Sequence, residues 1–126
     1  MSKENTAFDL EDRLIDFAVR IIRTSESLPK NKVGKHIAGQ LIRSGTSPAP
    51  NYGEAQSAES RADFIRKMKI SLKELRETRI WLIMIVRADL IKPPSKLKSL
   101  IDENNQLISI FVKSVDTAKE NSKRTS

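Results

Sequence analysis

The sequence contains no cysteine, and this absence excludes several kinds of chemistry at once. Disulfide bridges, cysteine-based zinc sites, iron–sulfur clusters and thiol catalysis all require that side chain. There is also only one histidine, His36. A di-iron helical bundle uses two Glu-x-x-His motifs, which a single histidine cannot supply. We therefore expect no metal, no cofactor and no enzymatic activity, and we interpret His36 as a solvated surface residue.

Long apolar runs are missing as well. No run approaches the roughly 18 residues that a membrane span needs, and the start, "MSKENTAFDLEDR", is too polar for a signal peptide. A chain of 126 residues is about the size of one domain. These features predict a single-domain cytoplasmic protein with no membrane partner.

Glycine is scarce, with four in the chain, and no stretch alternates as a strand would. Apolar residues instead recur at helical spacing, which predicts an all-α bundle. Asp9 and Ser95 are the expected N-caps of the first and last helices. The predicted helices cover residues 9–25, 31–58, 60–90 and 96–118, and residues 119–126 read as a frayed or disordered tail.

Two of these helices carry more apolar surface than one bundle face needs. The first has one stripe of Leu10, Leu14, Phe17 and Ile21, and a roughly opposite stripe of Phe8, Ile15, Val19 and Ile22. This pattern predicts neighbours on both sides, and the stripe of Phe8, Ile15, Val19 and Ile22 is expected to face a partner subunit. The third contains "IWLIMIV", which is apolar all round; Ile80, Trp81 and Met84 then suggest a subunit interface. The alternative is deeper burial of this helix within its own chain.

The second helix contains two prolines in "SPAPN". If Ser47 is an N-cap, Pro48 and Pro50 fall in the first turn, where amide groups have no helical partner. We therefore predict a helix that bends near Ser47–Pro50 and keeps its direction. The stretch is not a P-loop, because the Gly–Lys–Ser/Thr signature and a preceding strand are both absent.

Acidic residues are outnumbered, at 16 against 23 basic ones, so the formal net charge is +7. The excess is concentrated in residues 61–92, with nine basic and four acidic side chains. A basic stripe on the third helix comprises Arg66, Lys69, Lys73 and Arg76, and Arg87 returns to that face about three turns later. Such a stripe attracts polyanions, RNA or DNA among them, although a merely solvated face fits the same pattern.

A second group of polar residues reads as structural. Arg43 could pair with Glu54, or with Glu74 and Glu77 across a helix interface. Glu74 and Glu77 lie one turn apart and could instead suggest acid–base chemistry, but the nearby arginines make ion pairs the simpler account. A ligand or nucleic-acid site at these residues is the remaining alternative.

The stretch "QLIRSGTSPAPNYGEAQSAESRADFIRKMKISLKELRETRIWLIMI" resembles the signature region of four-helix-bundle proteins encoded within intervening sequences of bacterial 23S ribosomal RNA genes. Pro50 departs from the pattern, since a small residue is more usual there. The matching positions are Arg43, Ser44, Ser47, Asn51 and Glu54, then Asp63, Phe64, Ile65 and Lys67, then Glu74, Glu77, Thr78, Trp81 and Leu82.

The resemblance implies an antiparallel up-down-up-down bundle that assembles into a homopentamer. A similar pentameric bundle is the accessory protein of diversity-generating retroelements, whose basic surface engages nucleic acid and a reverse transcriptase. From the residues themselves, Ser47 and Asn51 are expected to satisfy backbone groups left open by the prolines.

Three functional hypotheses follow. The first is a non-catalytic homo-oligomeric bundle whose basic face binds RNA or DNA through phosphate contacts. The second is a protein-interaction scaffold in which the basic stripe is only solvated and a protein partner is bound elsewhere. The third is an enzyme with an unrecognised site. With a single Trp and a single Tyr available for base stacking, any binding should be led by the backbone and weakly sequence-specific.

Overall fold

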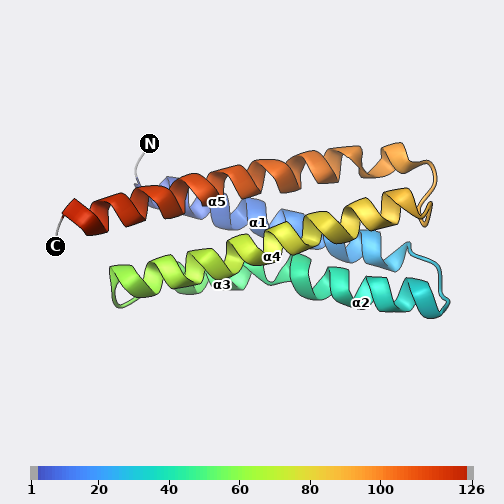
Figure 1. Ribbon diagram of the computed structural model, residues 1–126, viewed down its shortest axis with the longest axis horizontal. Helices are drawn as coiled ribbons and strands as arrows, with labels where there is room; N and C mark the ends of the chain where they lie inside the picture. Colours follow the sequence, from blue (N-terminus) through green and yellow to red (C-terminus); the bar gives the residue numbers. More distant parts are fainter. Residues whose placement is uncertain (1–2, 125–126) are drawn as a thin grey trace.

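The chain folds into helices packed side by side, as a computed structural model shows (Figure 1). The structure describes residues 3–124, and the side chains of residues 9–123. Within that part of the chain there is no strand. The elements are α1 (Lys3–Glu26), α2 (Lys32–Thr46), α3 (Pro48–Gln56), α4 (Arg61–Arg87), the 3₁₀ turn η1 (Pro94–Leu97) and α5 (Lys98–Arg124).

The helices form a four-helix bundle in which α2 and α3 together make one arm. Successive arms run in opposite directions, giving the predicted up-down-up-down order (Figure 1). α4 packs against α5, α2 and α3, while α1 packs against α2, α3 and α5. Between α1 and α5, Arg13 forms a two-pronged ion pair with Glu103, at 2.7 and 2.8 Å, and this hydrogen bonding raises the pKa of Arg13.

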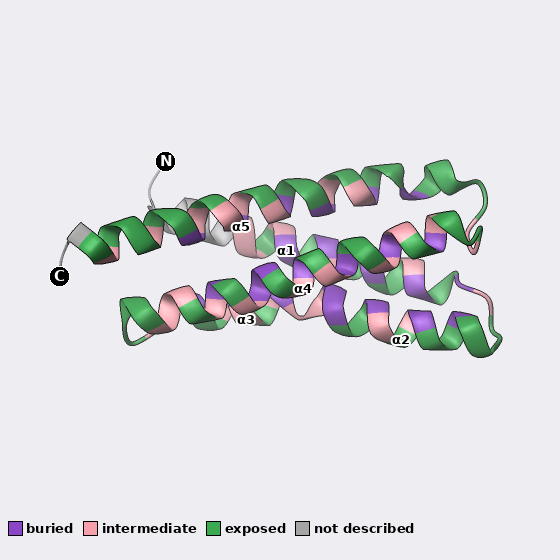
Figure 2. Ribbon diagram, in the orientation of Figure 1, coloured by how far each residue is buried: buried purple, intermediate pink, exposed green. Residues whose placement is uncertain are grey.

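The core lies where the apolar stripes of the arms meet (Figure 2). Leu14, Phe17 and Ile21 of α1 are almost fully buried there. The opposite stripe of α1 stays exposed: 47% for Ile15, 39% for Val19 and 41% for Ile22. Within one chain this stripe is therefore uncovered, and its assignment to an oligomer interface stays a prediction. Phe8, which belongs to the same stripe, lies outside the described side chains.

The predicted bend is present between α2 and α3. Ser47 has helical backbone angles (φ −71°, ψ −37°), so the chain continues in nearly the same direction, and Pro48 is the first residue of α3. Ser47 occupies the expected N-cap position but makes no capping hydrogen bond. Pro48 and Pro50 lack N–H groups, so they interrupt the helical ladder at the bend rather than redirect the chain.

Several helix ends differ from those predicted. α1 begins at Lys3, so Asp9 is an internal residue rather than an N-cap, because residues 3–8 contain nothing that breaks a helix. Pro94 rather than Ser95 opens the last arm, as a 3₁₀ turn without a side-chain cap. α5 continues to Arg124, so the tail expected from residue 119 is helical that far; residues 125–126 lie outside the described residues.

Candidate nucleic-acid interface

The basic residues of α4 line one side of a groove. Lys69, Lys73 and Arg76, spaced four and three residues apart, lie on the surface next to α5. The groove has a volume of about 440 Å³. Its floor is apolar, and its far wall belongs to α5. Besides the three cations, its lining consists of Leu72, Val112, Val115, Asp116 and Lys119.

The three α4 cations are exposed and make no ion pair within the described part of the chain. Their charge is therefore not neutralised by a neighbouring carboxylate at hydrogen-bond distance. Asp116 is the one acidic side chain that lines the groove. The groove thus carries four positive charges and one negative charge.

Two members of the predicted stripe belong elsewhere. Arg66 donates to Asp63 one turn before it, at 2.6 Å, so part of its charge is compensated. Arg87 lies at the other end of α4, where it lines an apolar cleft with Ile80, Ile83 and Met84. The structure therefore groups three of the five residues and separates the other two.

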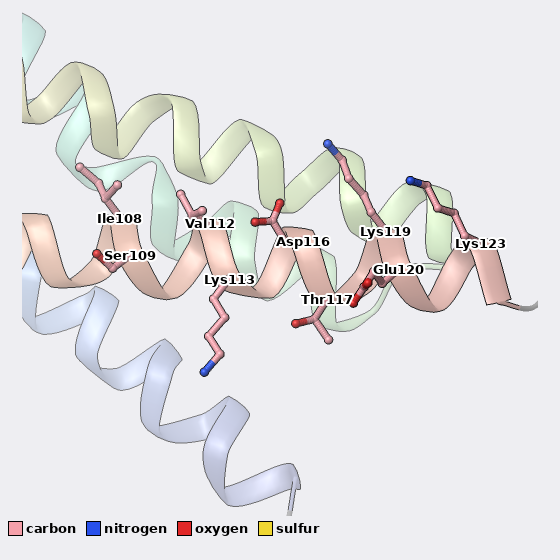
Figure 3. Close-up of a pocket in the computed structure, with 9 residues that line it drawn as sticks. All are labelled: Ile108, Ser109, Val112, Lys113, Asp116, Thr117, Lys119, Glu120 and Lys123. Atoms are coloured by element: carbon pink, nitrogen blue, oxygen red, sulfur yellow. The ribbon is translucent and has the colours of Figure 1, made fainter.

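Sequence reasoning missed the contribution of α5 to the groove. Figure 3 shows Val112, Asp116 and Lys119 on the side of α5 that faces α4, whereas the amine of Lys113 extends from a different side. A second concavity of about 690 Å³ on α5 shares Val112, Asp116 and Lys119 with the groove and extends to Lys113 and Lys123. The 3–4 spacing of Asp116, Lys119 and Lys123 places them on one helix face, but the sequence does not show that this face meets α4.

The second group of polar residues connects α2 to α4. Arg43 forms ion pairs with Glu74, at 3.1 Å, and with Glu77, which is the second of the two alternatives that the sequence left open. Glu77 also accepts a hydrogen bond from the indole Nε1 of Trp81 at 3.1 Å. The ring of Trp81 in turn meets His36 edge-on, with centroids 6.1 Å apart. Both carboxylates are thus engaged by neighbouring donors.

The remaining residues of this group form separate contacts rather than one network. Buried Ser44 accepts from Thr78 at 2.9 Å, which joins α2 to α4 inside the core. Elsewhere, Asn51 donates to both the carbonyl and the hydroxyl of Ser47, and Glu54 pairs with Lys67 at 2.7 Å instead of with Arg43. Sequence reasoning also missed Ser71, whose buried hydroxyl donates to the carbonyl of Pro48.

Exposed apolar surface gathers beside this cluster. Ile80 is 50% exposed and Met84 is 44% exposed. With Ile37 and Ile83 they line a cleft of about 610 Å³ between α2 and α4. Trp81, also predicted to face a partner, is half-buried against the core instead. The alternative of deeper burial within the chain therefore holds for Trp81 and not for Ile80 or Met84.

The described residues offer no cluster of three or more histidine, cysteine or acidic side chains that could hold a metal ion. In the same part of the chain, no helix has both the length and the apolar character to cross a bilayer. His36 is exposed, as the sequence suggested.

These features define a small helical bundle with a cationic groove on one side and an uncovered apolar cleft on another. The 23S rRNA-intervening sequence protein family has a model that matches residues 8–113, and the chain belongs to this family. A protein of unknown function from the S23 ribosomal protein family of Bacteroides thetaiotaomicron VPI-5482 has a similar crystal structure. The two share 33% sequence identity with a TM-score of 0.77, over 83% of this chain and 96% of the other. A search of curated proteins found no match.

Proposed function

We propose that this protein is a non-catalytic, homo-oligomeric bundle of the cytoplasm that binds RNA or DNA by the phosphate backbone. The observation that carries this proposal is the row of Lys69, Lys73 and Arg76, which are exposed and have no ion pair among the described residues. Uncompensated cations in a row form a region of positive potential that attracts a polyanion. The net charge of +7 adds a weaker attraction over the whole surface.

Reversing the three charges of the row should remove binding. We expect the Lys69→Glu, Lys73→Glu, Arg76→Glu variant to lose at least about tenfold in affinity for both RNA and DNA, because phosphate contacts dominate such affinities. The measurement is fluorescence anisotropy of labelled fragments across a salt series. In the unmodified protein, log affinity should fall linearly with log salt.

A matched control separates the row from the overall charge. The Lys32→Glu, Lys35→Glu, Lys92→Glu variant changes the net charge equally, at exposed positions away from the groove. It should bind nearly as well as the unmodified protein at about 0.1 M salt, where exposed charges beyond about 10 Å are screened. If both variants lose affinity equally, the row is not the binding site. If the unmodified protein fails to bind at low salt, the protein-interaction scaffold becomes the better account.

Self-association is the second part of the proposal. The chain exposes two different apolar strips, Ile15–Val19–Ile22 on α1 and the cleft around Ile80 and Met84. Residues 1–28 carry four basic and six acidic side chains, whereas residues 61–92 carry nine and four. The segment that contains the α1 strip is therefore net acidic and the segment that contains the α4 cleft is net basic, so charge attraction between the two segments favours their contact. Two unlike surfaces that meet head to tail build a ring when the rotation between subunits closes, and a homopentamer, which the family resemblance implies, is such a ring.

Placing a charge in either strip should dissociate the assembly. We expect Ile15→Asp and Met84→Asp each to convert the protein to a monomer of 14.3 kDa. Every contact of a head-to-tail ring uses both surfaces, so a buried charge on one of them disrupts all contacts. Size-exclusion chromatography with light scattering gives the mass. Val33→Asp is the control, since Val33 is 57% exposed but belongs to neither strip. A monomeric unmodified protein, or an assembly that survives both changes, would contradict this part of the proposal.

A further inference from the structure

The groove between α4 and α5 has cations on both of its walls. Lys69, Lys73 and Arg76 stand on the α4 wall, and Lys119 stands on the α5 wall. A basic stripe on the crest of one helix would contact a polyanion from one side only. Here a bound chain could be contacted from two sides, while the apolar floor of Leu72, Val112 and Val115 lies beneath it.

From this geometry we infer that the groove binds one single-stranded phosphodiester chain rather than a duplex. The inference rests on the proposed function and specifies its substrate class. Packed helices lie about 8–10 Å apart, axis to axis. The major groove of B-DNA alone is about 12 Å wide, so a whole duplex is too wide to enter and can only lie across the rims. A single strand is narrower than a duplex and can lie along the groove.

The length of the cationic row suits a short stretch of one strand. Lys69 and Arg76 are seven residues apart, which is about 10 Å along a helix. That distance corresponds to about three stacked nucleotides, at about 3.4 Å each. With Lys119 opposite, four cations can meet about three or four phosphates. The expected slope of log affinity against log salt is therefore about −2 to −3, at about −0.7 per phosphate of a single strand.

The groove provides little with which to read bases. Its floor holds leucine and valine rather than aromatic rings, so stacking of bases on aromatic side chains is absent from the lining. Binding in the groove is therefore independent of sequence. Asp116, between the cations, repels any phosphate placed beside it and weakens binding below what the four cations alone would provide.

Variants on α5 test the second wall without touching the α4 row. The probes are fluorescein-labelled 12-nucleotide oligo-uridine and oligo-thymidine and a 12-base-pair duplex, measured by anisotropy at about 0.1 M salt. The unmodified protein should bind both single strands at least about tenfold more tightly than the duplex. Lys119→Glu should weaken single-strand binding by about tenfold and make the salt slope shallower by about 0.7. Asp116→Asn should strengthen single-strand binding by about two- to threefold.

Lys113→Glu is the matched control, because it makes the same charge change on an exposed residue of the same helix that does not line the groove. It should alter affinity by less than about twofold once salt screens distant charges. Circular dichroism confirms that each variant is folded. Comparing oligo-uridine with oligo-thymidine shows whether RNA or DNA is preferred, and either preference supports the inference.

The outcomes separate the inference from the proposed function. Duplex binding as tight as single-strand binding, or equal effects of Lys119→Glu and Lys113→Glu, overturns the two-walled groove while leaving nucleic-acid binding intact. An oligoglutamate peptide that displaces oligo-thymidine at equal charge concentration also overturns it, because the groove would then accept acidic protein segments. Failure of every probe to bind at low salt overturns the proposed function itself.

Discussion

Replacing Gly34 by alanine should destabilise the protein by about 3 kcal/mol, the upper part of the range for overpacking. A Cβ added at Gly34 would lie 1.9 Å from the carbonyl oxygen of Pro29 and 2.8 Å from its carbonyl carbon. Both atoms belong to the backbone, so no side-chain rotation can relieve the clash. The connection between α1 and α2 must move, and the N-cap bond from the Gly34 amide to Asn31, 2.9 Å long, is then strained as well.

Gly39→Ala is the matched control within the same helix. A Cβ at Gly39 would meet nothing within 4 Å, so the gain in helix propensity should stabilise the protein by up to about 1 kcal/mol. Thermal unfolding followed by circular dichroism compares the two. We expect Gly34→Ala to lower the melting temperature by about 10 °C and Gly39→Ala to raise it by about 3 °C. A melting temperature unchanged in Gly34→Ala would contradict the close approach of α2 to Pro29.

The arrangement of the four arms could be predicted because apolar spacing and loop signals agree along most of the chain. Asn31 and Ser60 were expected near the starts of two helices, and in the structure both side chains cap those helices.

The end of α4 was not predicted correctly. It stops at Arg87, three residues early, because Asp89 adopts a left-handed conformation with φ 54°. The amides of Asp89 and Leu90 then bond to the carbonyls of Val86 and Ile85, as in a Schellman motif.

That ending was not visible in the sequence because glycine, the usual residue at a left-handed C-terminal position, is absent there. Asp89 adopts the conformation despite its Cβ, with Leu90 following it towards the core. The start of α1 was also predicted wrongly, because a residue that could cap a helix was present where the helix does not begin. A residue suited to capping, Asp9, was taken as the helix start, although capping preference says where a helix can begin and not where it must.

The polar pairs between α2 and α4 were partly predictable for a related reason. The partly buried carboxylates of Glu74 and Glu77 need donors, so an arginine on the facing helix limits the possible ion pairs to a few. Arg43 pairs with Glu74 and Glu77 because both lie on the facing helix α4. Glu54 lies beyond the bend and pairs with Lys67 instead. Spacing along one sequence cannot supply this three-dimensional choice.

The sequence predicted a basic helix face but not the groove, for a similar reason. Three cations on one helix face form a pattern that periodicity detects, so Lys69, Lys73 and Arg76 could be identified. Whether a lysine of another helix stands opposite depends on the register of α4 against α5. That register is set by core contacts, among them the bond from the buried Asn104 amide to the carbonyl of Leu75, at 3.2 Å. Lys119 therefore became a candidate only in the folded chain.

Truncating Phe111 to alanine should produce the largest loss of stability, about 3–5 kcal/mol. The side chain is completely buried, and its ring meets that of Tyr52 edge-on, with centroids 5.8 Å apart at 69°. α3 and α5 are not adjacent helices but both pack on α4, so this pair joins them through the core. Removing the ring therefore leaves a cavity and also loosens the part of the bent arm that follows the prolines.

Two measurements distinguish these consequences. Denaturant unfolding should show the full loss for Phe111→Ala and a smaller one, about 1–2 kcal/mol, for Phe111→Leu, which retains most of the apolar volume. Hydrogen exchange should then show α3 amides of Phe111→Ala opening at lower free energy than those of α2, because α2 keeps its buried contacts through Ile37 and Leu41. Equally faster hydrogen exchange in α2 and α3 would contradict the specific role of the Tyr52–Phe111 pair. A loss of less than about 1 kcal/mol in the free energy of unfolding would contradict the tight packing of Phe111. The expected selective loosening would show that the bend, which disrupts the helical ladder at Pro48 and Pro50, depends on the core rather than on its own backbone hydrogen bonds.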